Sequence, residues 1–102
     1  MEKRTFERIR VNLEIGFCCC SKVHEGTITN LSENGMFICT RKYLASDSKF
    51  VIVMRAEDNL LKILVRVKRL TIRNSQYDGM GVELVNPNDD YLKYVSKLKV
   101  AV

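Results

Sequence analysis

The stretch GTITNLSENGMFI, Gly26 to Ile38, contains two short runs of β-forming residues separated by a polar segment. Thr, Ile and Phe favour strands, whereas Asn, Ser and Gly favour turns. The stretch therefore predicts a strand, a connection and a second strand. The connecting NLSENG, Asn30 to Gly35, places an Asn, a Ser and a Gly at spacings of two and three residues. A simple hairpin needs less polar chemistry than this.

A period of two extends over most of the chain. Apolar residues alternate with polar or small ones from Val11 to Cys19, and again from Leu61 to Val67. This alternation predicts strands with one buried face. Further short runs between turn clusters predict strands near residues 49–55 and 80–85, so six strands are expected in all.

The pattern changes after Pro87. Tyr91, Val95 and Leu98 are spaced as on one face of a helix, and Asn88 or Asp89 can cap its first turn. Six short strands and one helix predict a mainly β fold, a small six-stranded antiparallel β-barrel with a C-terminal α-helix. The expected division is a basic arm over residues 1–10, the barrel over 11–86 and the helix over 87–102, all in one domain.

Composition limits the location and the partners of the chain. It has 102 residues, 46% of them apolar, and a net charge of +5, which fits one domain with a modest core and an anionic partner. No apolar run approaches the roughly 20 residues that span a bilayer. The segment MEKRTFERIR lacks the apolar region of a secretory signal. A cytoplasmic protein without membrane insertion is therefore expected.

No residues suggest an enzyme or a metal site. The three adjacent cysteines from Cys18 to Cys20 lack metal-ligand spacing, and they are expected to be small, reduced side chains. The only histidine, His24, is expected on the surface in a turn between strands, and in a strand it would face away from Glu25. No nucleophile–base pair is present, so neither catalysis nor a cofactor is expected.

The N-terminal arm is rich in basic residues: Lys3, Arg4, Arg8 and Arg10. Arg4 and Arg8 form R-x-x-x-R, and on an extended arm their Cα atoms would lie about 13 Å apart. Arginine forks bind phosphate or a guanine edge in a bidentate way. Arg69 and Arg73 repeat the spacing inside a predicted strand, where two solvated side chains are expected. From the residues alone, a solvated arm and an anion clamp both remain open.

The residues of NLSENG also have two interpretations. Asn30 can form an Asx turn, Ser32 can cap a turn, and Gly35 can adopt a positive φ. Alternatively, the Asn amide can bind a base edge, the Ser hydroxyl can bind phosphate, and Gly can let a ligand approach the backbone.

RTFER, followed about twenty residues later by NLSENG, resembles the PilZ domain, a bacterial receptor for cyclic di-GMP. The signature of this family is R-x-x-x-R followed by [D/N]-x-S-x-x-G. Arg4 and Arg8 match the first part, and Asn30, Ser32 and Gly35 match the second. The later GMGVELV resembles the G-V-x-F strand of the family, so the resemblance covers nearly the whole chain.

The resemblance implies a cyclic di-GMP site. Arg4 and Arg8 would embrace the phosphates and guanine edges, Asn30 would read a guanine, and Ser32 and Gly35 would line the contact. Lys3 and Arg10 are candidates for additional contacts. Binding would order the arm and change a protein-interaction surface that meets an unidentified effector, while residues from Ile9 onward would already be held by the first strand.

Two alternatives accompany this interpretation. The first is a PilZ-like protein-interaction module that does not bind cyclic di-GMP. The second is a small basic barrel that binds nucleic acid, which the net charge fits. The eight aromatic residues predict no outward stack of the kind that single strands need, so a DNA or RNA partner is not expected.

Overall fold

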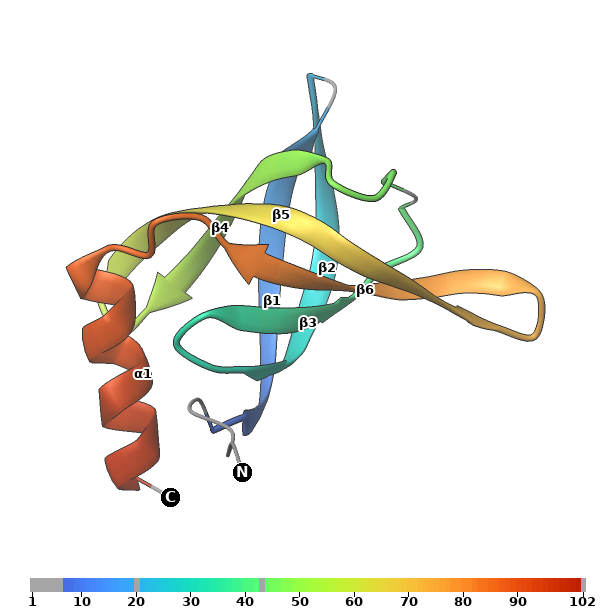
Figure 1. The fold of residues 1–102 in the computed structure, drawn as a ribbon. Coiled ribbons are helices and arrows are strands. Elements are labelled where there is room, and N and C mark those ends of the chain that lie inside the picture. The colour runs from blue at the N-terminus through green and yellow to red at the C-terminus, as the bar shows by residue number, and fades with distance from the viewer. Residues whose placement is uncertain (1–6, 20, 43, 102) are drawn as a thin grey trace.

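The computed structural model describes residues 7–19, 21–42 and 44–101. In this part of the chain, six antiparallel strands form a closed barrel and one helix follows them (Figure 1). The strands are β1 (Ile9–Cys19), β2 (Lys22–Leu31), β3 (Gly35–Cys39), β4 (Lys49–Ala56), β5 (Asn59–Arg73) and β6 (Gln76–Leu84). Their order is β1-β2-β3-β6-β5-β4, and pairing of β1 with β4 closes the barrel. The predicted fold class is confirmed.

The alternating apolar side chains fill the interior of the barrel. Leu61, Ile63, Val65 and Val67 of β5 are all buried, as their spacing predicts. Residues from every strand and from the helix are completely or almost completely buried, among them Phe17, Ile28, Leu31, Met36, Ile38, Ile52, Met54, Met80 and Val95. This continuous core fixes which face of each strand points outward.

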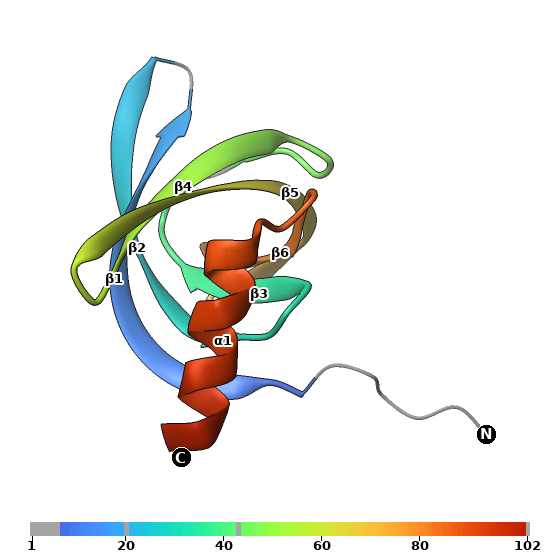
Figure 2. The ribbon, with the colours of Figure 1, turned by 90° about the vertical axis from the view of Figure 1, so that its left-hand side faces the viewer.

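The helix α1 (Asp89–Ala101) lies across one end of the barrel (Figure 2). Asn88 caps it, because its Oδ1 accepts a hydrogen bond from the backbone N–H of Tyr91 at 2.8 Å. Tyr91 and Val95 are fully buried, and Leu98 packs partly buried against the core, so the predicted apolar face is confirmed. Among the described residues, no helix is long and apolar enough to cross a membrane.

Some boundaries differ from the expected ones. His24 lies in β2 opposite Phe17, with ring centroids 5.5 Å apart, so the prediction of a turn there was wrong. The reason is that β1 and β2 pair up to Cys19 and Lys22, which leaves only a very short connection. At the other end, β1 begins at Ile9, so Arg10 is part of the barrel wall.

Irregular strand pairing changes which side chains face outward. The register shifts between Ile28 and Asn30 where β2 pairs with β3, and between Val67 and Arg69 where β5 pairs with β6. Strict alternation from the buried Ile28 and Val67 would turn both polar residues inward. The bulges place them on the outer face instead. A further shift follows Arg10 in the pairing of β1 with β2.

Candidate functional site

The NLSENG segment joins β2 to β3. Asn30 lies within the end of β2, and Gly35 is the first residue of β3, so only residues 32–34 form the loop. The backbone N–H of Ser32 donates to the carbonyl of Gly35 at 2.8 Å. The Ser32 hydroxyl donates to Oδ1 of Asn34 at 3.0 Å and accepts from its backbone N–H at 3.3 Å. Ser32 is only 1% exposed and holds the loop together from inside.

Gly35 is required for close packing between two strands. It does not have a positive φ, so that part of the turn interpretation was wrong. A Cβ at this position would lie 2.9 Å from the carbonyl oxygen of Val82 on β6 and 3.8 Å from Nη2 of Arg8. A side chain here would therefore push β3 away from β6 and reach the arginine beside it.

The two sequence motifs meet through one hydrogen bond. Nη1 of Arg8 donates to Oδ1 of Asn30 at 2.5 Å, although the residues are 22 positions apart in sequence. Arg8 is exposed immediately before β1, and Asn30 is half-buried on β2. The bond holds the guanidinium over the outer surface of the barrel. Arg4 and Lys3, also predicted as site residues, lie outside the described residues.

A shallow concavity of about 290 Å³ adjoins this hydrogen bond. It is lined by Arg8, Arg10, Asn30, Phe37, Arg69 and Gly81. Its lining contains three guanidinium groups and no carboxylate, so it suits an anion. Its volume is near the lower limit of small-molecule sites, about 300 Å³. Among the described residues, no group of three His, Cys, Asp or Glu side chains can hold a metal ion.

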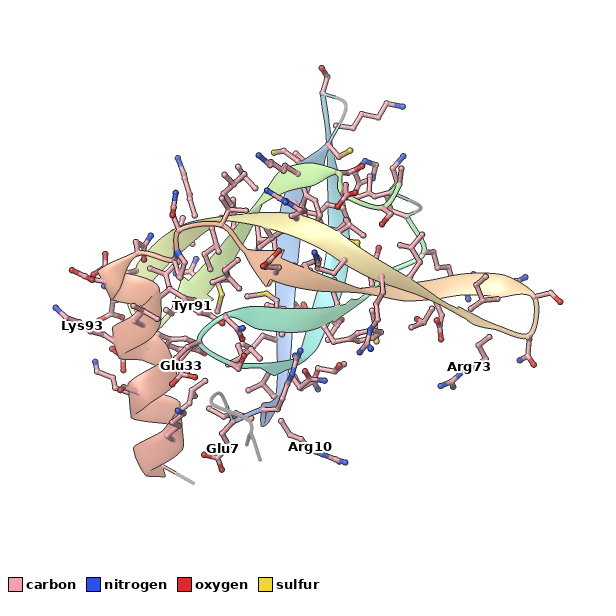
Figure 3. The ribbon with its side chains drawn as sticks, in the orientation of Figure 1. Glu7, Arg10, Glu33, Arg73, Tyr91 and Lys93 are labelled. Carbon is pink, nitrogen blue, oxygen red and sulfur yellow. The ribbon has the colours of Figure 1, made fainter. Side chains whose placement is uncertain are left out.

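The sequence did not predict that Arg69 and Phe37 belong to this concavity. Arg69 was expected to be simply solvated, like Arg73 four residues later. Arg73 does lie apart, near the tip of the β5–β6 hairpin and far from Arg10 (Figure 3), and it pairs with Asp78 at 3.5 Å. The bulge in β5 brings Arg69 to the site, and the residue pattern carries no signal of that bulge.

The loop is also attached to α1. The buried hydroxyl of Tyr91 donates to the carbonyl oxygen of Ser32 at 2.6 Å, and the ammonium of Lys99 pairs with the carboxylate of Glu33. Tyr91 and Glu33 lie where the helix faces the loop (Figure 3). Burial raises the pKa of Tyr91 well above its usual value, and the hydrogen bond from Lys99 lowers the pKa of Glu33. The helix is therefore attached to the motif by one neutral and one charged contact.

Comparison with known proteins gives one family and several structures. The family model of the PilZ domain matches residues 2–98. The inhibitor of motility MotI/DgrA from Bacillus subtilis has 15% identity and a TM-score of 0.79, over 99% of this chain and 52% of that one. The PilZ domain of YcgR from Escherichia coli, solved with c-di-GMP, has 11% identity and a TM-score of 0.73, over 95% of this chain and 88% of that one.

A third similar structure is the MrkH–c-di-GMP complex of K. pneumonia, with 16% identity and a TM-score of 0.74, over 98% of this chain and 52% of that one. The chain thus spans about half the length of MotI/DgrA and of MrkH. At these identities the similarity establishes the fold. A search of curated proteins finds no match.

Proposed function

Because the chain belongs to the PilZ domain family, whose members are cyclic di-GMP receptors and not enzymes, we propose that it binds cyclic di-GMP on the outer surface of its barrel. The observation that carries the proposal is the hydrogen bond from Arg8 to Asn30, at the edge of a concavity with three arginines and no acid. Cyclic di-GMP offers two phosphates and two guanine edges, and arginine forks bind both kinds of group.

Each motif residue has a distinct task in this proposal. Arg8 presents its remaining N–H donors to the ligand while Asn30 fixes the direction of its guanidinium. Arg4 closes the clamp from the arm, and Lys3 and Arg10 add positive charge. Gly35 keeps the surface beside Arg8 free of a side chain.

The proposed signal passes from the loop to the helix. Ligand binding orders part of the arm, and it also contacts the loop between β2 and β3. This loop is joined to α1 by the contacts of Ser32 with Tyr91 and of Glu33 with Lys99. An altered position of the arm against α1 then changes the surface that an effector protein binds. Ligand favours one of two arrangements, so the mechanism is a population shift.

The free energies constrain how much of the arm can become ordered. Micromolar affinity requires about −8 kcal/mol, and each bidentate arginine contact contributes about 1–3 kcal/mol. Ordering a residue costs about 1–2 kcal/mol. Because Ile9 and Arg10 already belong to β1, only a few preceding residues need to become ordered. Hydrogen exchange of the ligand-free protein should therefore show protected amides from about Ile9, and protection that begins only beyond Leu13 would contradict this.

Calorimetric titration with cyclic di-GMP tests the proposal. Wild-type protein should release or absorb heat with saturation, and Arg8→Ala should bind at least about tenfold more weakly. Arg73→Ala is the matched control, since it removes the same charge far from the concavity. A folded wild-type protein that gives no binding heat would instead favour a PilZ-like protein-interaction module without ligand.

A further inference from the structure

The strand register places five outward residues in one row across the barrel wall. Arg10 on β1 is opposite Asn30 on β2, and Asn30 is opposite Phe37 on β3. Phe37 is opposite Gly81 on β6, and Gly81 is opposite Arg69 on β5. The row has an arginine at each end and an aromatic ring near its centre. All five residues line the concavity of the candidate site.

Two glycines of β6, Gly79 and Gly81, leave the sheet surface beside Phe37 and Arg69 without side chains. A Cβ at Gly79 would lie 2.8 Å from Cζ of Phe37, and a Cβ at Gly81 would lie 3.2 Å from Nε of Arg69. The ring therefore lies over Gly79, and the arginine side chain lies along the sheet over Gly81. Both planar groups occupy space that side chains on β6 would otherwise fill.

The guanidinium of Arg69 has no counterion among the described residues. Two other basic residues of β5 do have counterions, because Lys68 pairs with Glu83 at 3.7 Å and Arg73 pairs with Asp78 at 3.5 Å. The bulge after Val67 directs Arg69 to the concavity, where it faces two further arginines. Such a cluster of like charges is stabilised by an electron-rich ligand.

We propose that Phe37 and Arg69 form a guanine-binding subsite at the end of the row remote from Arg10. One strand, β6, lies between these two residues, and both side chains lie against it, Phe37 beside Gly79 and Arg69 beside Gly81. The base packs on the exposed part of the Phe37 ring, and the Arg69 fork donates to its O6 and N7 atoms. The inference rests on the proposed function of the same concavity, and it identifies what reads one guanine of the ligand.

The test compares three arginine variants in calorimetric titrations with cyclic di-GMP. Arg69→Ala should raise the dissociation constant about tenfold or more. Arg69→Lys should recover little of the loss, because an ammonium keeps the charge but lacks the planar fork. Arg73→Ala, on the same strand, should bind like wild type. Far-UV circular dichroism of each variant confirms that the barrel is folded.

Phe37→Leu supplies a second measurement, because it keeps an apolar side chain on the outer face of β3 but removes the aromatic stacking surface. It should weaken binding severalfold, in line with the loss of one base–aromatic contact. If wild type binds and Arg69→Ala binds equally well, the subsite is wrong although the receptor function stands. Wild-type affinity in Arg69→Lys, or equal losses of affinity in Arg69→Ala and Arg73→Ala, would show that Arg69 contributes only its positive charge. Either result would overturn guanine recognition by Arg69. If wild-type protein itself does not bind, the proposed function fails and the subsite with it.

Discussion

Replacing Tyr91 by Phe removes one hydroxyl and leaves the buried ring in place. The hydroxyl is completely buried and donates to the Ser32 carbonyl at 2.6 Å, so the change leaves that carbonyl without this donor. An unsatisfied buried group costs about 1–3 kcal/mol. For a domain of this size, 1 kcal/mol corresponds to about 4–8 °C. The melting temperature of Tyr91→Phe should therefore fall by at least about 4 °C.

The same variant should change the alkaline pH dependence of stability. Because burial raises the pKa of Tyr91 above its ordinary 10.0, the folded protein keeps a proton that the unfolded chain loses. The free energy of unfolding should thus be unaffected below pH 10 and should fall above it, by up to about 1.4 kcal/mol per pH unit. Tyr91→Phe has no such proton and should lose most of this slope.

Urea denaturation between pH 8 and 11 measures both effects. Tyr94→Phe is the control, since Tyr94 is only partly buried and its pKa is also raised by burial. That variant should keep most of the alkaline fall. Tyr91→Phe could instead be as stable as wild type at pH 8 and show the same fall in the free energy of unfolding above pH 10. That result would refute a stabilising contact between this hydroxyl of α1 and the loop.

Two further changes test the contacts around the motif. Gly35→Ala should destabilise the protein by about 1–3 kcal/mol in urea denaturation, because its Cβ would lie 2.9 Å from the Val82 carbonyl. Gly16→Ala is the control, since the nearest atoms there are at 3.8 Å, and it should change stability by less than about 1 kcal/mol. Equal losses of stability in the two variants would contradict the reasoning. Because Lys99 lowers the pKa of Glu33, their ion pair stabilises the protein above pH 4.5 and is lost as the pH falls through the lowered value. Lys99→Ala should remove this contribution of the ion pair to the free energy of unfolding. If the free energy of unfolding of wild type and of Lys99→Ala falls identically with decreasing pH, the ion pair does not stabilise the protein.

The regular parts of the fold could be predicted because burial imposes a simple period on them. One face of β5 is core, so Leu61 to Val67 alternate without interruption. In α1 the buried Tyr91 and Val95 are four residues apart, and Asn88 marks the start with its cap. In such segments a residue has the same burial as its neighbour two positions away in a strand or four positions away in a helix. The spacing of apolar residues in the sequence therefore shows which positions are buried.

The site could be predicted only in part, because bulges interrupt that period. The motif pair of Arg8 and Asn30 was identified by resemblance, and the structure joins them directly. Arg69 was not identified, since it was expected to be simply solvated, and strict alternation from Val67 would give no reason to place it at the site. One inserted residue turns it outward. Whether an extra residue is accommodated by a bulge depends on the partner strand, which is distant in sequence.

In the proposed function, the two motifs act as one clamp on cyclic di-GMP. A double-mutant cycle with Arg8→Ala, Asn30→Ala and the combined variant, each titrated by calorimetry, measures whether they do. Asn30 accepts a hydrogen bond from the Arg8 guanidinium, and its proposed task is to hold that group. The combined variant should therefore bind about as weakly as Arg8→Ala alone, with a coupling free energy of about 1 kcal/mol or more. Losses that add to within about 0.5 kcal/mol would contradict the clamp.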